Sequence, residues 1–163
     1  MTTTETLAPS ILVTGGAGYI GSHAVLALEQ AGYQVIILDS LEYGHRSLVE
    51  QHLNAKLIEG NTTDRALLDR LFEQYNVAAV MHFAAYIAVG ESVTSPAKYY
   101  HNNVYGTLNL LQAMEAAGVR RLVFSSTCAI YGPPKTVPIP EDHPKNPISP
   151  YASSKLMVEM MLQ

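Results

Sequence analysis

Short apolar runs alternate along the chain with segments in which apolar residues recur at helical spacing. Aliphatic and β-branched residues dominate five runs that are typical of buried strands. These runs are Ser10–Val13, Gln34–Leu38, Lys56–Glu59, Val77–Phe83 and Arg121–Ser125. Helices are predicted over Tyr19–Ala31, Arg46–Leu53, the segment after a candidate N-cap at Asp64, Pro96–Gly118 and Ala152–Gln163. Alternating apolar strands and helices predict an α/β fold, a doubly wound parallel sheet of the Rossmann type.

One long segment, Gly132–Pro150, matches neither pattern. Seven of the nine prolines of the chain lie there. Because proline fixes φ and removes a backbone donor, this segment is predicted to be an ordered loop. A loop of this length in a compact domain usually has a functional role or is disordered.

Length and composition limit the classes of protein to which this chain can belong. A chain of 163 residues predicts one domain over residues 1–163, and 48% apolar residues are enough for a core. The net charge of −4 without a basic cluster argues against nucleic-acid binding. The single cysteine excludes an internal disulfide, and no apolar run is long enough to span a membrane. No secretory signal is evident, so we expect a cytoplasmic protein.

A glycine-rich segment, Thr14–Gly21 (TGGAGYIG), follows the first strand directly. Gly16, Gly18 and Gly21 satisfy the G-x-G-x-x-G pattern, with a strand before it and a helix after it. Such glycines allow a tight turn and a close approach to a pyrophosphate, which the amides at the helix N-terminus attract. The segment therefore predicts a dinucleotide site. Its predicted cofactor-binding residues are Gly15, Gly18, Tyr19, Ile20 and Gly21.

Two polar residues follow the next strands. Asp39 ends the second strand, where a carboxylate can accept hydrogen bonds from the adenosine ribose and repel a 2′-phosphate. This position favours NAD over NADP, although capping of the following loop is an alternative. Asn61 follows the third strand and is predicted either to contact adenine or to form a turn.

The last predicted helix begins near a tyrosine and a lysine that are four residues apart. Tyr151 and Lys155 share one helix face, and Thr127 lies just after the fifth strand. In a parallel sheet, chemistry occurs at the carboxyl ends of the strands, so these three side chains are expected to converge near a nicotinamide. A nearby ammonium favours the phenolate, so Tyr151 is predicted to accept a hydroxyl proton during hydride transfer.

Five motifs together carry a family resemblance. They are TGGAGYIG, Phe83-Ala84-Ala85, NNVYGT from Asn102, SSTCAIYG from Ser125 and YASSK from Tyr151. In this order and position, they resemble the extended short-chain dehydrogenase/reductases, and most of all the nucleotide-sugar 4-epimerases of that family. The resemblance implies a tightly held NAD and a UDP-sugar substrate. The sugar 4-hydroxyl would be oxidised to a keto group that is reduced again on its other face, interconverting UDP-glucose and UDP-galactose.

The resemblance also assigns roles to residues. Tyr151 would be the base, Lys155 its tuning group and a ribose ligand, and Thr127 the hydroxyl partner. Asn103 would order the site from the middle of a helix. The remaining cofactor-binding residues implied are Asn61, Thr62, Phe83, Ala84, Ala85, Asn103 and Ser125. Full-length members form homodimers through the two long helices.

Three departures from the family pattern matter. Sugar dehydratases carry an acid directly after the threonine, whereas this chain has Cys128 and Ala129, which disfavours dehydration. Ile87 replaces a lysine that often contacts the pyrophosphate, and Asn61-Thr62 replaces an acid followed by an aliphatic residue. The family also continues into a C-terminal substrate domain. The chain is therefore expected to be an N-terminal portion that is inactive alone. A silent NAD-binding fragment and a UDP-arabinose 4-epimerase are alternatives.

The remaining candidate residues are predicted to have structural roles. None of the six histidines has metal-ligand spacing, so no metal site is expected. His82 lies in an apolar strand and is predicted to be a core histidine with its hydrogen bonds satisfied. Cys128 is predicted to be a packed thiol, and Leu108, Leu111 and Met114 a core stripe.

Overall fold

The structure is a computed structural model that describes residues 8–163. The chain divides into two compact units, which are treated separately below. The first unit contains residues 8–84 and Asn109–Ser125, and the second contains Ala85–Leu108 and Ser126–Gln163. The assignment of residues 1–163 to one domain stays a prediction.

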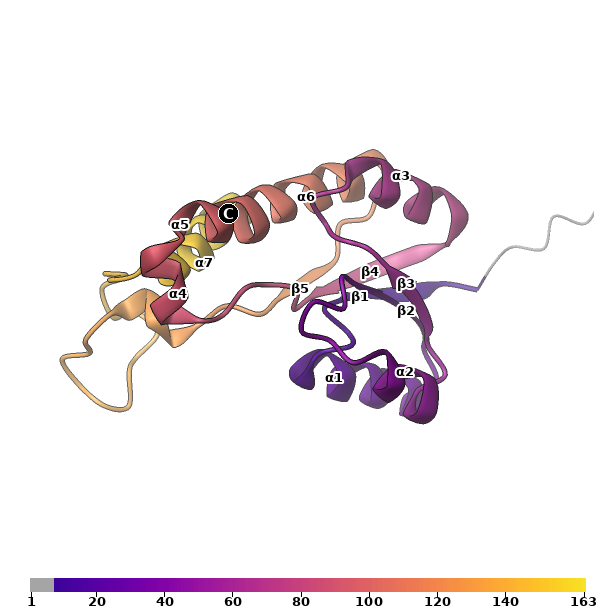
Figure 1. Cartoon of the computed structure of the whole chain (residues 1–163), viewed down its shortest axis with the longest axis horizontal. Coiled ribbons are helices and arrows are strands. Elements are labelled where there is room, and N and C mark those ends of the chain that lie inside the picture. The colour runs from indigo at the N-terminus through magenta and orange to yellow at the C-terminus, as the bar shows by residue number, and fades with distance from the viewer. Residues whose placement is uncertain (1–7) are drawn as a thin grey trace, which may run out of the picture. The chain divides into compact units, whose positions relative to one another are not determined.

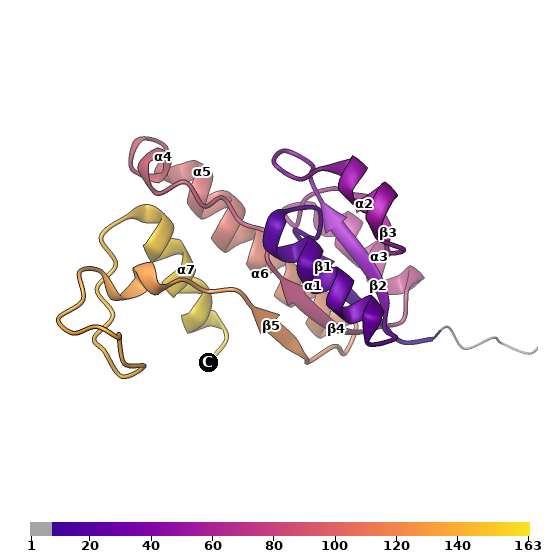
Figure 2. The same ribbon diagram turned by 90° about the horizontal axis from the view of Figure 1, so that it is seen from below.

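The first unit is built on a five-stranded parallel sheet. Its strands are β1 (Ser10–Thr14), β2 (Gln34–Asp39), β3 (Lys56–Glu59), β4 (Val77–His82) and β5 (Leu122–Phe124). They lie in the order β3-β2-β1-β4-β5 (Figure 2). Because β1 lies at the centre, the order runs outward to β3 on one side and to β5 on the other. This arrangement confirms the predicted doubly wound α/β fold.

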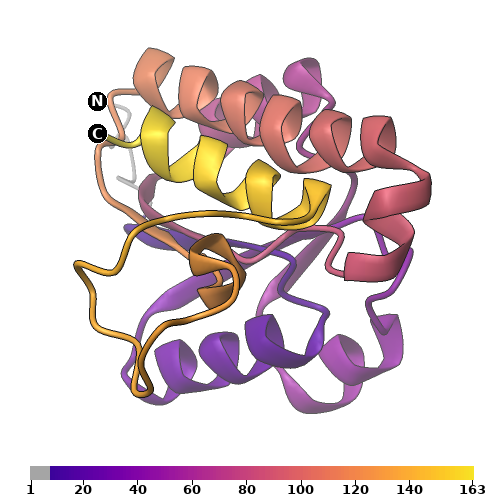
Figure 3. The ribbon, with the colours of Figure 1, turned by 90° about the vertical axis from the view of Figure 1, so that its left-hand side faces the viewer.

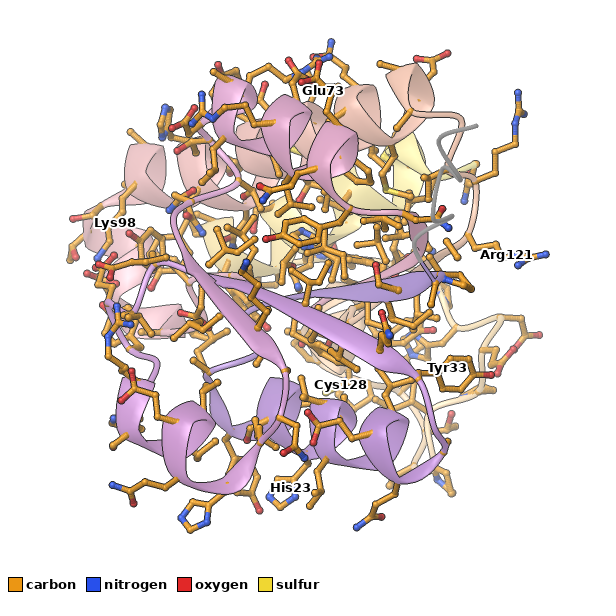
Figure 4. All side chains as sticks on the ribbon, turned by 90° about the vertical axis from the view of Figure 1, so that its right-hand side faces the viewer. His23, Tyr33, Glu73, Lys98, Arg121 and Cys128 are labelled. Carbon is orange, nitrogen blue, oxygen red and sulfur yellow. The ribbon has the colours of Figure 1, made fainter. Side chains whose placement is uncertain are left out.

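Helices cover both faces of this sheet (Figure 1). They are α1 (Tyr19–Gln30), α2 (Arg46–His52), α3 (Arg65–Gln74) and α6 (Gly106–Ala116), of which α6 enters the first unit at Asn109. Figure 1 shows α1 and α2 on one face, with α3 and α6 on the other. In Figure 4, His23 on α1 and Glu73 on α3 point outward from opposite helical layers.

Alternation along the strands explains why both faces are covered. Successive strand residues point to opposite sides, so Leu12 packs with Leu68 and Leu110 while Val13 packs with Val25 and Val49. Each strand therefore contributes to two apolar cores, one under each pair of helices. The predicted cap is also confirmed, because Asp64 Oδ1 accepts a hydrogen bond of 3.0 Å from Leu67 N–H at the start of α3.

The second unit consists of helices, turns and the proline-rich loop. Its elements are α4 (Val89–Thr94), α5 (Pro96–Tyr99), the π-helical turn η1 (Tyr100–Tyr105), the 3₁₀ turn η2 (Cys128–Tyr131) and α7 (Pro150–Met161). Figure 3 shows α7 in yellow alongside the continuous run of α5 and η1. Residues 132–149 contain neither helix nor strand, as predicted.

Three local predictions need correction. The helix predicted from Pro96 begins there, but it passes through η1, and α4 before it was not predicted. Helix α7 begins at Pro150, two residues earlier than predicted, because the Ser149 side chain caps it. Leu108 is 41% exposed, so the stripe with Leu111 and Met114 is only partly core. Within residues 8–163, no helix is long and apolar enough to cross a membrane.

Candidate functional site

The glycine-rich segment turns sharply between β1 and α1. Gly15 has φ +73°, and its N–H donates to Leu38 O at 2.8 Å. A Cβ at this position would lie 2.7 Å from Ala84 N. Both the left-handed backbone and this close approach exclude larger residues, so Gly15 shapes the turn itself.

Two further glycines allow the loop and helix to pack closely. A Cβ at Gly21 would lie 2.1 Å from Gly15 O, inside the loop. A Cβ at Gly16 would lie 2.9 Å from the Ile37 side chain on β2. These two positions bring the N-terminus of α1 against the sheet, and packing within the chain is enough to explain them.

Gly18 differs, because no contact among the described residues requires a glycine there. Its φ of −85° suits any residue, and the nearest atom to an added Cβ is Gly15 O at 3.4 Å. Gly18 is also the N-cap of α1 and provides no side-chain acceptor for the first-turn amides. The next two residues, Tyr19 and Ile20, are 82% and 60% exposed. The helix N-terminus is thus open to an anion on the side where Gly18 has no side chain.

Asp39, at the end of β2, is buried and firmly held. Its Oδ2 accepts from Ala17 N–H and its Oδ1 from Leu41 N–H, each at 2.9 Å. A Cβ at Gly44 would lie 2.7 Å from Oδ1, so that glycine leaves room beside the carboxylate. The alternative of loop capping is therefore present in the structure. Each oxygen keeps a second lone pair, so the predicted ribose contact is compatible with it.

The Asn61-Thr62 pair forms a turn after β3. Asn61 Oδ1 accepts from Thr63 N–H at 2.9 Å, which is the turn alternative of the two predicted roles. Thr62 is buried, and Asn109 Nδ2 on α6 donates to Thr63 O at 3.0 Å. This segment is therefore fixed in place, while its contact with adenine stays a prediction.

Further predicted cofactor-binding residues of the first unit follow the carboxyl ends of β4 and β5. Phe83 N–H donates to Thr14 O at 3.0 Å, and Ser125 N–H donates to His82 O at 3.2 Å. Phe83, Ala84 and Ser125 thus follow the ends of neighbouring strands, where parallel sheets bind ligands. His82 is 2% exposed and its Nδ1 lies 2.6 Å from Thr14 Oγ1, which confirms the prediction of a hydrogen-bonded core histidine.

The predicted catalytic residues all lie in the second unit. Tyr151 and Lys155 are on the first turns of α7 and are 9% and 4% exposed. Ser149 Oγ accepts from Ala152 N–H at 3.2 Å and Pro150 occupies the first turn, which fixes the start of this helix. Burial lowers the pKa of the Lys155 ammonium to about 8. Lys155 is therefore still largely protonated at neutral pH, but it is poised to lose its proton.

Asn103 holds this helix through its side chain. Its Oδ1 accepts from Tyr86 N–H at 2.9 Å, while its Nδ2 donates to Tyr86 O at 3.0 Å and to Ser154 Oγ at 3.1 Å. The π-helical turn η1 carries Asn103, and Ala85, of the same unit, directly precedes Tyr86. Asn103 therefore joins η1, Tyr86 and α7, while its predicted roles in ordering the site and in contacting the cofactor stay predictions.

Thr127 caps the short turn η2 that follows β5. Its Oγ1 accepts from Ala129 N–H at 3.2 Å, which leaves the hydroxyl proton available for donation. Cys128 is exposed, so the prediction of a packed thiol is wrong. It is the first residue of a 3₁₀ turn whose buried residue is Ile130.

Three residues of the second unit were missed from the sequence. Ser154, inside YASSK, donates to Tyr151 O at 2.6 Å. Glu159 accepts from Ser126 Oγ and from Lys145 Nζ, each at 2.5 Å. The i, i+4, i+8 spacing of Tyr151, Lys155 and Glu159 could have indicated this shared helix face. His143 in the proline-rich loop accepts from Lys135 N–H at 3.2 Å, and no sequence signal indicated that contact.

Among residues 8–163, no group of three or more potential ligand side chains is arranged to hold a metal ion. Glu91, Lys98 and Tyr99 form a separate hydrogen-bonded network on α4 and α5, in which Tyr99 is buried and the two charged side chains are partly exposed. Tyr99 OH lies 2.7 Å from Glu91 Oε2, and Lys98 Nζ lies 2.9 Å from Glu91 Oε1. Burial and then the hydrogen bond to Glu91 raise the pKa of Tyr99 to about 12. This tyrosine is therefore a structural group of the second unit.

Comparisons with known proteins agree with this geometry. A UDP-glucose 4-epimerase of Lactobacillus helveticus is 51% identical over 152 residues, which cover 93% of this chain and 46% of that protein. A UDP-glucose 4-epimerase of Brucella ovis, solved in complex with NAD, superposes with a TM-score of 0.91 at 46% identity, over 95% of this chain and 47% of the other. The Thermotoga maritima enzyme, solved with UDP-glucose, has a TM-score of 0.89 at 41% identity, over 94% and 50%.

The chain thus spans about half the length of the curated relatives it matches. The model of the NAD dependent epimerase/dehydratase family matches residues 11–163, almost the whole described chain. The resemblance carried by the five sequence motifs is confirmed at this level. From the glycine turn to the tyrosine helix, the chain belongs to the NAD dependent epimerase/dehydratase family.

Proposed function

We propose that this chain is the NAD-binding and proton-transfer part of a UDP-glucose 4-epimerase, which interconverts UDP-glucose and UDP-galactose. Relatives with this name are about half identical to it along nearly its whole length. The observation that carries the proposal is the space at Gly18. No neighbouring atom of the protein fills the position of its missing Cβ, and the open end of α1 faces it.

The residues present fit NAD. The open first turn of α1 suits the pyrophosphate, and the fixed Asp39 carboxylate suits the two ribose hydroxyls better than a 2′-phosphate. The residues proposed to hold the cofactor are Gly15, Gly18, Tyr19, Ile20, Gly21, Asp39, Asn61, Thr62, Phe83, Ala84, Ala85, Asn103, Ser125, Tyr151 and Lys155. When bound, NAD supplies the reversible oxidation of the sugar carbon that bears the 4-hydroxyl.

Tyr151 is the proposed base for the sugar 4-hydroxyl. A phenol must lose its proton before it can accept one, and a lysine ammonium on the same helix face stabilises the phenolate. Lys155 is protonated at neutral pH and buried, so its charge acts in a poorly screened environment. Thr127 is proposed to donate its hydroxyl proton to the same oxygen of the sugar.

The family name includes dehydratases, and the turn η2 argues against that reaction. Elimination of water needs an acid to protonate the leaving hydroxyl. Thr127 is followed by Cys128 and Ala129, neither of which is a carboxylic acid. Epimerisation eliminates no water and therefore needs no such acid, only the proposed base with its partners and the bound NAD.

Homodimerisation and a cytoplasmic location are part of the proposal. Four large apolar side chains of the second unit are between 41% and 65% exposed. They are Tyr105 on η1, Leu108 at the start of α6, and Met157 and Met160 on α7. Apolar side chains on two neighbouring helices are typical of a helix–helix interface. Sedimentation of the chain should therefore show dimers that Leu108→Lys with Met160→Lys abolishes. Val137→Lys, at an exposed loop position, should not change the dimer.

Cofactor binding is tested on the chain itself. Titration calorimetry should show NAD binding, and Gly18→Ala should weaken it about tenfold or more while leaving the unfolding midpoint nearly unchanged. Gly90→Ala is the control for adding a methyl group to a glycine, because a Cβ there meets nothing within 4 Å. Equal NAD affinity in the wild type and Gly18→Ala would contradict the proposed cradle.

The reaction is tested by completing the chain. Residues 1–163 joined to the remaining part of the Lactobacillus helveticus relative should convert UDP-galactose to UDP-glucose, and Tyr151→Phe should abolish turnover while NAD stays bound. The chain alone is expected to bind NAD without turnover. Retained turnover in Tyr151→Phe would remove the tyrosine from its proposed role.

A further inference from the structure

A buried polar pair lies directly beneath the glycine turn. Thr14, the last residue of β1, and His82, the last residue of β4, are 0% and 2% exposed. Thr14 Oγ1 and His82 Nδ1 are 2.6 Å apart, and the two residues are partners in the strand register. Their polar groups therefore meet at the carboxyl edge of the two central strands.

The direction of this hydrogen bond depends on the tautomer of the imidazole. Ala84 N–H also approaches Thr14 Oγ1, at 3.5 Å. In the tautomer that carries its proton on Nε2, the Thr14 hydroxyl donates to His82 Nδ1. This tautomer is a premise of the role proposed below, and NMR tests it.

The ring of His82 is fixed independently. It stacks on Phe124 of β5, with ring centroids 5.9 Å apart and an interplanar angle of 26°. The imidazole therefore presents Nδ1 to Thr14 from a constant position. An apolar residue in this strand could provide the stacking but not the acceptor.

The pair lies beside the close approach of Gly15 to Ala84, on which the glycine turn depends. Thr14 O accepts from Phe83 N–H at 3.0 Å, while Gly15, the next residue, comes so close to Ala84 that a Cβ would lie 2.7 Å from its nitrogen. Thr14 is thus joined to the chain after β4 through its carbonyl and, over a longer distance, through its hydroxyl. Loss of the hydroxyl would release the side of the turn that faces Ala84.

We propose that His82 and Thr14 are positioning residues for the dinucleotide cradle: the imidazole orients the threonine hydroxyl, and the hydroxyl sets the distance between Gly15 and Ala84. The inference rests on the proposed binding of NAD. Neither side chain is exposed to a ligand, so both act through the backbone of the turn.

The test compares two buried hydroxyls at opposite ends of β1. Thr14→Val removes the hydroxyl at the cradle, and Ser10→Ala removes the one that donates to Asn76 O at 3.2 Å at the other end. Thr14→Ser restores the hydroxyl. We expect Thr14→Val to weaken NAD binding about tenfold, as expected for a displaced binding group, and Ser10→Ala and Thr14→Ser to bind within about twofold of wild type. Affinities are measured by calorimetry at a temperature where every variant is folded.

A second readout reports on the proton assignment. In ¹⁵N NMR spectra, His82 should show an unprotonated Nδ1 and a protonated Nε2, and Thr14→Val should shift the Nδ1 signal. His82→Phe keeps a ring against Phe124 but has no acceptor. Combined with Thr14→Val, it should cost no more NAD affinity than either change alone, because both remove one interaction.

The outcomes separate this inference from the proposed function. If the wild type binds NAD and Thr14→Val binds it equally well, the positioning role is wrong while the proposed function stands. If the wild type binds no NAD, the proposed function is wrong, and amide exchange at Gly15 and Phe83 decides the inference. Faster exchange in Thr14→Val than in Ser10→Ala supports it, and equal exchange overturns it.

Discussion

Asn103 and Ser154, 51 residues apart in the sequence, are joined by a buried hydrogen bond of 3.1 Å from Asn103 Nδ2 to Ser154 Oγ. Ser154 Oγ in turn donates a hydrogen bond to Tyr151 O at 2.6 Å. The asparagine on η1 is thereby connected to the backbone of the tyrosine on α7. The same amide also holds both backbone polar groups of Tyr86. One side chain thus fixes three segments of the second unit.

Asn103→Ala should therefore be strongly destabilising. It leaves buried partners at Tyr86 and Ser154 without their hydrogen bonds, and each such loss costs about 1–3 kcal/mol. Urea denaturation should show a lower free energy of unfolding, and Ser154→Ala should show a smaller loss. The double variant should lose less than the sum of both changes, because they share one hydrogen bond. Strict additivity would contradict the network.

The π-helical turn that presents Asn103 was beyond prediction from the sequence. Residues 96–118 have helical spacing throughout, and nothing in that spacing distinguishes an extra residue in one turn. The tertiary hydrogen bonds of Asn103 hold it there. By contrast, the start of α7 at Pro150 was predictable, because serine followed by proline is typical of an N-cap and a first helical position.

Gly21→Ala should disrupt the cradle, whereas Gly90→Ala should be tolerated. An added Cβ at Gly21 would lie 2.1 Å from Gly15 O, and the next nearest atoms, Gly15 C and Gly16 Cα, also belong to backbone that cannot rotate away. We expect a loss of about 2 kcal/mol or more in unfolding free energy. Gly90, inside α4, has open space around it, so alanine should stabilise that helix by up to about 1 kcal/mol. Chemical denaturation of both variants checks this, and similar losses would be inconsistent with the packing at Gly21.

The two glycines also show how far a motif can be interpreted. The G-x-G-x-x-G pattern indicated a turn and a helix start, and both are present. It did not distinguish Gly21, which the fold requires, from Gly18, which only a ligand would require. Cys128 shows the same limit, since it was predicted to be a packed thiol and the structure exposes it. Such distinctions depend on how closely folded atoms approach each position, which a pattern of residue types does not specify.

Glu159→Gln should weaken the attachment of the proline-rich loop to α7. Burial raises the pKa of Glu159, but hydrogen bonds from Lys145 and Ser126 outweigh it and hold the pKa below its ordinary value. A lowered carboxyl pKa stabilises the fold above the unfolded pKa, and this stabilisation is lost as the pH falls through the folded pKa. Glutamine keeps an acceptor for Ser126 but loses the charge facing Lys145. We expect a loss of about 1 kcal/mol at pH 7 and a flatter stability curve below about pH 5.

A control separates the charge from the hydrogen bond. Lys145→Met should cost about as much as Glu159→Gln, and the double variant should cost little more. Ser126→Ala should leave the acid dependence in place, because the ion pair remains. A Glu159→Gln variant with unchanged acid unfolding would show that this carboxylate has no net role in stability.

Lys155 should make the fold more stable as the pH rises from about 8 to about 10.5. Burial lowers its pKa to about 8 in the folded chain, so between this value and the unfolded pKa the unfolded chain binds more protons. The cost of burying the charge is therefore largest below pH 8, where it amounts to about 3 kcal/mol. Lys155→Met should remove this cost and raise the unfolding free energy at pH 7. The gain should shrink towards pH 10.5, as measured by urea denaturation across this range.

Lys135→Met is the matched control, since Lys135 is an exposed lysine of the proline-rich loop. It should leave the pH dependence between 8 and 10.5 as in the wild type, because it removes no buried charge. A gain from Lys155→Met that does not change with pH would mean that methionine packs better and that charge burial is not the cause. In the completed enzyme, Lys155→Met should nevertheless abolish turnover. Lys155 would then destabilise the fold while supporting Tyr151, which is a trade-off between stability and activity of the kind found at functional sites.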